Sequence, residues 1–162
     1  MRRRRLDAEA IRDSLLVVAG RLDASLGGTA FADLAIPRRT LYLQSVRTGP
    51  SSTGFGRLFD RADPGSIVAV RGESVVAPQA LFFLNDPFLT ETARALAARV
   101  AREAPETNEA RIRWLYALAL NRPPAPAELS VGEQFLATEA GVDPWERYCQ
   151  LILCQNEFIY IE

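Results

Sequence analysis

Arginine, tyrosine and aspartate side chains that could bind an anion or a sugar gather in the first half of the sequence. The candidate cluster consists of Arg38, Arg39, Tyr42, Arg47, Asp60 and Asp63. A guanidinium holds a carboxylate or phosphate through two parallel hydrogen bonds, so two aspartates that fold back onto the arginines would form an ion-pair network. Two interpretations stay open: the network orders a loop-rich region, or it surrounds a pocket for an anion or a carbohydrate.

Carboxylates in the same region also fit the residue types of a hydrolytic acid pair. Asp60, Asp63 and Glu73 are the candidates, and glycoside hydrolysis needs two such acids about 5–10 Å apart. Asp60 and Asp63 instead stand in a turn-like phrase before Pro64, where aspartate commonly starts turns. We therefore assign no catalytic residue here. Two further polar candidates, Gln79 and Asn85, bracket a short apolar segment, where amides usually satisfy backbone groups.

Two residue types that carry much of enzyme chemistry are missing. The 162 residues contain no histidine, and all 19 basic residues are arginine. Without histidine there is no serine–histidine or cysteine–histidine nucleophile pair, no ordinary catalytic zinc site and no c-type haem attachment motif. Without lysine there is no Walker phosphate site and no Schiff base. The sequence favours a non-catalytic role and assigns no residue to a cofactor or a metal.

Charge and hydropathy narrow the choice of partners. The net charge is −1, so we expect no nucleic-acid binding in spite of the run Arg2–Arg5, which we interpret as a solvated helix start with an Arg5–Glu9 pair. No apolar run approaches the roughly 20 residues of a membrane span.

Cys149 and Cys154 lie five apart in a predicted helix, where their side chains diverge too far for a disulfide.

Periodicity and breakers place these side chains on a mainly α-helical chain. Apolar spacing predicts helices over 5–19, 78–84, 86–103, 107–120, 126–140 and 143–155. Short strands are predicted at 40–46, 67–70 and 74–76, a loop at 49–56, and an extended tail at 158–161. We expect a single domain over 1–162, with a helix and a small irregular β and loop-rich segment in 1–76 and a helical part in 77–162.

Several helix ends carry clear signals. Asp86-Pro87, Thr107 and Asp143-Pro144 are typical of helix starts, and Gly20 is typical of a helix end. Two uses are open for the aromatic residues. Trp114, Trp145, Phe82, Phe83 and Phe88 either pack in the core or form a docking surface for further sequence.

A family resemblance rests on eight phrases in order. They are RRRLDAEAIRD at 3–13, GRLD at 20–23, RRTLYL at 38–43, FDRADP at 59–64, APQAL at 77–81, LN at 84–85, ALNRPP at 119–124 and NEF at 156–158. Together they resemble the C-terminal domain of unknown function in planctomycete-type proteins that often carry a cytochrome c module. One departure is Ser74-Val75-Val76, where that family usually shows paired threonines.

The resemblance implies a bacterial, periplasmic or other extracytoplasmic setting, with haem held only by a separate upstream domain. It also implies that further helical sequence of the same domain precedes the RRRL phrase, so the chain is expected to be the C-terminal part of a longer domain. It implies no reaction. The expected function is a non-catalytic interaction or structural module that contacts sister domains or a protein partner. The alternative is a carbohydrate- or anion-binding module built on the arginine, tyrosine and aspartate cluster.

Overall fold

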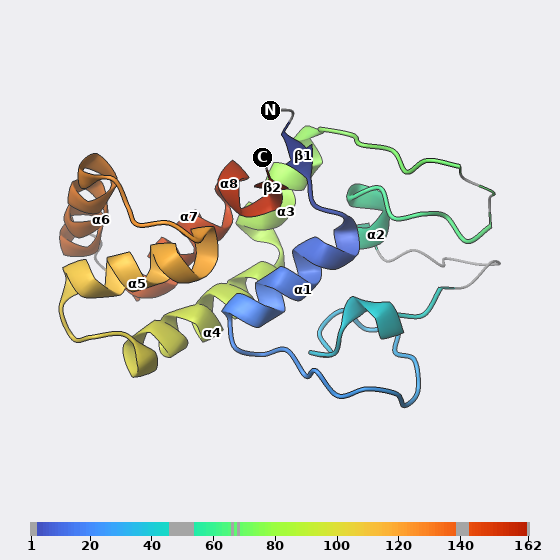
Figure 1. Ribbon diagram of the computed structural model, residues 1–162, viewed down its shortest axis with the longest axis horizontal. Coiled ribbons are helices and arrows are strands. Elements are labelled where there is room, and N and C mark those ends of the chain that lie inside the picture. The colour runs from blue at the N-terminus through green and yellow to red at the C-terminus, as the bar shows by residue number, and fades with distance from the viewer. Residues whose placement is uncertain (1–2, 46–53, 66, 68, 139–142, 162) are drawn as a thin grey trace.

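Helices dominate the part of the chain that the structure describes, as the sequence predicts. This computed structural model describes residues 3–45, 54–65, 67, 69–138 and 143–161. Its helices are α1 (Ala8–Val18), α2 (Gly54–Leu58), α3 (Ala77–Asn85), α4 (Pro87–Glu103), α5 (Asn108–Leu120), α6 (Pro126–Thr138), α7 (Pro144–Leu153) and α8 (Asn156–Ile159). Its strands are β1 (Arg4–Arg5) and β2 (Tyr160–Ile161). The described residues between α1 and α3, which are rich in loops, spread over one side of the molecule, away from α5 and α6 (Figure 1).

A two-stranded antiparallel sheet joins the two ends of the chain. Arg4 pairs with Ile161 and Arg5 with Tyr160, and the N–H of Leu6 continues the pairing by donating to the carbonyl of Ile159 (2.8 Å). Figure 1 shows the two terminal segments side by side. The pairing explains one correction: the tail predicted as extended over 158–161 is extended only from Tyr160, because residues 158 and 159 belong to α8.

The core is centred on α4, which packs against α1, α3, α5 and α7. The apolar stripe predicted for this helix is confirmed, because Leu89, Ala93, Leu96 and Val100 are all buried. Facing side chains from the other helices complete the core, among them Ile11 and Leu15 of α1, Ile112 and Leu115 of α5, and Cys149 and Ile152 of α7. Both cysteines are free thiols, as their spacing predicts.

The predicted helix starts are confirmed by their hydrogen bonds. Asp86 accepts from the N–H of Phe88 (2.9 Å), Thr107 from Ala110 (3.3 Å) and Asp143 from Trp145 (2.9 Å). Such caps satisfy donors that the first helical turn leaves without a partner. Gly20 follows α1 with a φ of 68°, the left-handed conformation that glycine adopts without a Cβ clash.

The first helix begins three residues later than predicted. Asp7 has extended backbone (ψ 154°) and α1 starts at Ala8, while Arg5 lies in β1. The predicted Arg5–Glu9 pair is therefore wrong. Strand pairing turns the Arg5 side chain inward to Asp60 (2.7 Å), which lies 55 residues away in the sequence.

The middle segment differs most from the prediction. Residues 40–42 form a 3₁₀ helix in place of the predicted strand, because the N–H and hydroxyl of Thr40 both donate to Asp13 of α1 (2.8 and 2.6 Å). Isolated parallel bridges, Asp23 with Arg38 and Phe31 with Leu43, are the β structure found nearby. The described residues of 67–70 and 74–76 form no strand. Residues 54–56 of the predicted loop begin α2, and 49–53 lie outside the described residues.

A buried arginine holds this middle segment onto α1. Arg12 is 0% exposed, and its terminal nitrogens donate to the carbonyls of Leu34, Ile36 and Arg38 and to the hydroxyl of Thr40. Burial lowers the pKa of Arg12, and the neighbouring Asp13 carboxylate opposes that shift. Even so, an arginine stays charged at physiological pH. The loop over 34–40 is thus held in place by hydrogen bonds from the single guanidinium of Arg12.

The aromatic side chains pack inward. Phe83 is buried and packs edge-on to Phe59 (5.9 Å between ring centroids), while Phe82 contacts Phe55 (5.3 Å). Phe88, Trp114 and Trp145 are half-buried against the same core. Of the two uses predicted for these residues, the structure therefore shows core packing for Phe83, while the other four pack against the core and stay partly exposed.

Candidate functional site

Four side chains from distant parts of the sequence meet where β1, α2 and α3 come together, and we call this set the Arg5 junction. Its members are Arg5, Asp60, Ser74 and Gln79. Arg5 donates to Asp60 (2.7 Å) and to the carbonyls of Phe59 (3.3 Å) and Ser74. Ser74 donates to Asp60 through its N–H (2.8 Å) and its hydroxyl (2.8 Å).

Gln79 completes the junction from the first turn of α3. Its amide nitrogen donates to the carbonyls of Leu58 (2.8 Å) and Ser74 (3.1 Å), and its oxygen accepts from the N–H of Val76 (3.3 Å). Gln79 is 6% exposed, so it serves the backbone as the sequence predicts. Asn85, the other candidate amide, is exposed at the last residue of α3.

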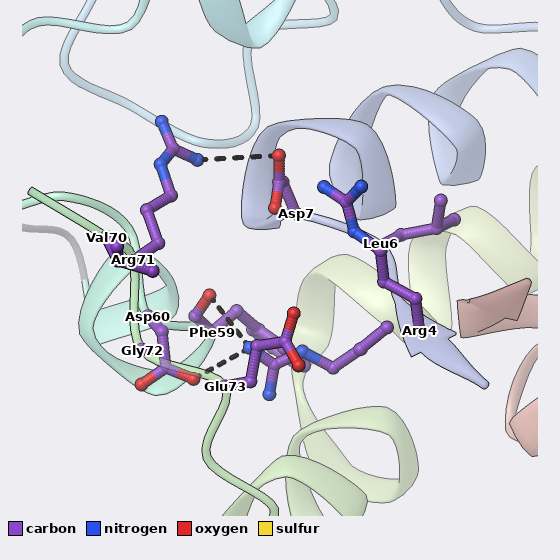
Figure 2. A pocket seen from close by; sticks show the side chains of 10 residues that line it. Arg4, Leu6, Asp7, Phe59, Asp60, Val70, Arg71, Gly72 and Glu73 are labelled. Atoms are coloured by element: carbon purple, nitrogen blue, oxygen red, sulfur yellow. Dashed lines mark hydrogen bonds and ion pairs between the residues drawn. The ribbon is translucent and has the colours of Figure 1, made fainter. Parts of the chain in front are cut away.

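A cavity of about 250 Å³ lies beside the junction. Its lining comes from three segments: Arg4–Asp7 at the start of the chain, Phe59–Asp60 after α2, and Val70–Glu73. Figure 2 shows Arg71 reaching toward Asp7 across one side of the cavity, with Asp60 and Glu73 on the opposite side. The cavity therefore carries charges of both signs.

Most of these charges are already paired within the chain. Arg71 binds both carboxylate oxygens of Glu9 (2.7 and 3.3 Å) and lies 3.9 Å from Asp7. The Nε atom of Arg61 also lies 3.4 Å from a carboxylate oxygen of Glu9. Such a bidentate arginine–carboxylate pair has both preferred geometry and charge assistance.

The carboxyl groups of the site are held in their ionised form. Burial raises the pKa of Asp60, but the hydrogen bonds from Arg5 and Ser74 outweigh it, and the pKa of Asp60 is lowered overall. The pKa of Glu9 is likewise lowered, because Arg71 and Arg61 outweigh its burial. A general acid needs a raised pKa near neutrality, so neither group has the property of a proton donor.

The predicted arginine and tyrosine candidates lie elsewhere and have other partners. The guanidinium of Arg38 stacks on the ring of Tyr42 (4.4 Å) and donates to the carbonyls of Thr29 (2.9 Å) and Gly27. Arg39 lies 3.7 Å from Asp13. The structure thus divides the candidate cluster: Arg38 and Tyr42 order the loop over 27–42, Arg39 contacts α1, and Asp60 belongs to the Arg5 junction.

Asp63 and Arg47 are the two remaining candidates. Asp63 accepts from the N–H of Gly65 (2.9 Å), a local turn contact of the kind that its sequence context predicts. Arg47 lies outside the described residues.

Sequence reasoning missed Arg5 and Arg71 as members of the site. The run of arginines at the N-terminus resembles a solvated helix start, and a lone Arg71 in a stretch with glycine carries no motif. Their partners lie 55 and 62 residues away, and only tertiary packing brings such pairs together. The one available signal was the family phrase around Arg5.

Two further kinds of feature are absent from the described residues. No group of three or more histidine, cysteine, aspartate or glutamate side chains is arranged to hold a metal ion there. In the same residues, no helix has the length and apolar character needed to cross a membrane.

Comparison with known proteins gives one match. The family model described as PSD1, a protein of unknown function (DUF1553), matches residues 1–136, which span β1 to most of α6. No curated protein matches the chain, and no solved structure matches it. The resemblance seen in the sequence is thereby confirmed at the level of a domain of unknown function, and the chain belongs to the PSD1 (DUF1553) family.

Proposed function

We propose that this chain is a non-catalytic structural and interaction module of a larger bacterial protein. One observation carries the proposal: the charged side chains best suited to bind a ligand fasten segments of the chain to one another. Arg5 ties β1 to Asp60 and Ser74, Arg12 holds the loop over 34–40, and Arg38 holds the loop over 27–29. A ligand would have to displace these contacts before it could bind.

The setting of the module follows from the sequence resemblance. That resemblance supports an extracytoplasmic protein linked to cytochrome c, in which a separate domain holds the haem. Exposed apolar side chains support contact with a sister domain or partner. Leu81 and Leu84 of α3 are 55% and 52% exposed, and Gln150, next to the exposed Leu151, donates to the carbonyl of Leu84 (2.9 Å).

The test compares folding stability with ligand binding in two variants of the same cavity. We expect Asp60→Ala to lower the free energy of unfolding by about 1–3 kcal/mol, since it removes the carboxylate that accepts from Arg5 and from the N–H of Ser74. Glu73→Gln is the matched control, because Glu73 lines the same cavity and makes no hydrogen bond to a described residue. Urea unfolding measures both.

Calorimetric titration with inorganic phosphate and with maltotriose tests the alternative function. The proposal predicts no saturable binding of either probe to the wild-type chain. Saturable binding that Asp60→Ala abolishes while stability stays unchanged would establish an anion or carbohydrate site and overturn the proposal.

A further inference from the structure

Arg111 of α5 is a guanidinium without a partner among the described residues. Its Nε atom is buried and donates no hydrogen bond, and its terminal nitrogens make no hydrogen bond or ion pair there. The Nε atoms of Arg5 and Arg12 are also buried without a bond, but the terminal nitrogens of both bind several acceptors. Arg111 as a whole is half-buried, and a buried donor such as its Nε that the fold does not satisfy calls for an explanation.

The position of Arg111 gives no benefit to its own helix. It is the fourth residue of α5, close to the end where the helix dipole is positive, and a cation is unfavourable there. The nearest acid in the helix, Glu109, is paired with Arg113 (2.8 Å). Neither the dipole nor an ion pair within the helix accounts for this arginine.

Arg111 lines a cavity of about 330 Å³ between α4, α5 and the start of α7. Four small apolar residues of α4 line it: Ala97, Ala98, Val100 and Ala101. Trp145 contributes an aromatic ring that is half-buried and packs edge-on to Tyr148 (5.9 Å). Cavities of about 300–1,000 Å³ with apolar walls and a few placed polar groups are typical of small-ligand sites.

The other charged side chains that line this cavity have partners within the chain. Arg94 binds Glu146 (3.1 Å), and Asp143 caps α7 by accepting from the N–H of Trp145 (2.9 Å). Arg111 is thus the charged side chain of this lining that has neither a hydrogen bond nor an ion pair among the described residues. A planar carboxylate suits the guanidinium fork, which can donate two parallel hydrogen bonds to it.

We propose that Arg111 binds a carboxylate whose attached apolar or aromatic body packs on Trp145 and the alanines of α4. The shared chemistry has two possible sources: a free aromatic acid, or an acidic side chain next to an aromatic one in a partner protein. This site lies apart from the Arg5 junction, since its lining shares no residue with the cavity there. Its test is therefore independent of the proposed function.

The experiment follows the two indole N–H signals by ¹H–¹⁵N NMR, with Trp114→Phe to assign them. The chain has two tryptophans, and Trp114 contacts Arg99 (5.6 Å) instead of this cavity. Phenylacetate should shift the Trp145 signal saturably and leave the Trp114 signal in place. Phenylacetamide, which has the same body without the charge, should bind at least tenfold more weakly.

Matched variants test the role of the arginine. Arg111→Gln should weaken phenylacetate binding at least tenfold without lowering the thermal midpoint, because no internal contact is lost. Arg113→Gln, an exposed arginine on the same helix, should leave binding unchanged. A structural arginine would behave in the opposite way, with a lower midpoint.

A second probe, the blocked dipeptide acetyl-Phe-Glu-amide, separates the two sources. Binding of phenylacetate supports a free acid as the ligand, and binding of the dipeptide alone supports a partner side chain. The proposal is overturned if neither probe gives a saturable shift, if phenylacetamide or phosphate binds as well as phenylacetate, or if Arg111→Gln binds like the wild type.

Discussion

Arg12 is the residue on which the loop-rich middle depends most directly. Its side chain is fully buried, and it donates to three backbone carbonyls and one hydroxyl between residues 34 and 40. It also lies over the rings of Phe31 (5.4 Å) and Phe88 (5.7 Å). A stretch with little regular structure of its own is thus fixed by a side chain from α1.

We expect Arg12→Met to lower the free energy of unfolding by about 3–5 kcal/mol. Methionine fills much of the space, but it leaves the partly buried carbonyls of Leu34, Ile36 and Arg38 without the donor that binds all three. Urea unfolding followed by circular dichroism measures the change. Arg57→Met is the control, because Arg57 is exposed on α2 and its loss should change stability by less than about 0.5 kcal/mol. Equal midpoints for the two variants would contradict the prediction.

At the residue scale, the sequence predicted which residue types form ion pairs, but it did not predict which residues pair with one another. The arginines and Asp60 do form ion-pair and hydrogen-bond networks. The partner of Asp60 is Arg5, however, and that of Arg39 is Asp13. Any arginine in this chain can satisfy a carboxylate equally well, so composition cannot choose among them. The choice is made by backbone geometry, which strand pairing and helix packing set.

Gly132 lets three helices meet closely. It is buried in α6, and a Cβ at this position would collide with the hydroxyl of Tyr148 in α7 and press against Ile112 of α5 (3.1 Å). Tyr148 is itself 5% exposed and in contact with Phe135 and Trp145, so its ring has little room to move. The glycine is therefore a packing requirement at this contact.

We expect Gly132→Ala to destabilise the fold by about 1–3 kcal/mol, although alanine is the better helix former by about 1 kcal/mol. Adding Tyr148→Phe should recover part of the loss, since it removes the atom that Cβ would meet first. Thermal or urea unfolding of the two single variants and the double variant completes the cycle. A single Gly132→Ala variant that is more stable than the wild type would show that helix propensity outweighs the close contact.

Arg122 links α6 and α8 through charge. It follows α5 and binds Glu128 of α6 (2.7 and 2.8 Å) and Glu157 of α8 (2.7 Å). The hydrogen bond from Arg122 lowers the pKa of Glu128 to about 2 and also lowers that of Glu157. Because Glu128 is about one-third exposed (32%), solvent screening reduces what the pair adds to stability.

This network predicts a loss of stability in acid. The pKa of Glu128 is about 2 in the folded state and about 4.3 when unfolded, so the unfolded chain takes up the proton first. The contribution is full above about pH 5 and is lost as the pH falls toward 2. Urea unfolding at several pH values should show a shallower decline for Glu128→Gln. Glu133→Gln, an exposed position on the same helix, should decline like the wild type.

At the element scale, the helices could be predicted from the sequence, but the structure of the loop-rich segment between α1 and α3 could not. Asp86, Thr107 and Asp143 cap the helices they were predicted to cap, because capping is decided by a few neighbouring residues. The 3₁₀ turn at Thr40 depends on Asp13, which lies 27 positions earlier. Local patterns carry no information about a contact of that kind.

Over the whole molecule, the two halves of the chain share one core. Ile11 and Leu15 of α1 are fully buried in the same cluster as Leu89 and Leu96 of α4. Arg99 of α4 also donates to the carbonyls of Val17 (3.0 Å) and Val18 (2.9 Å) at the end of α1. The helical second half thus depends on the first half to cover its apolar surface.

We expect the fragment 77–162 to lack a cooperative thermal transition and to bind a dye for exposed apolar surface. Removing α1 leaves the face of α4 around Leu89 and Leu96 open to water, which is typical of a partly folded state. The intact chain should melt in one sharp transition. Circular dichroism and dye fluorescence on both proteins measure this. A sharp transition in the fragment would mean that α3 to α8 fold without α1.

The pairing of β1 with β2 places the first and last described strands side by side. Since Arg4 and Ile161 are paired across the two strands, a polypeptide that enters the module at β1 leaves it beside that point at β2. A short glycine-rich linker could therefore connect the two ends, and new ends could be opened between α4 and α5, around the exposed residues 105–107. For the same reason, the domain could be inserted into a surface turn of another protein without moving the residues on either side of that turn apart.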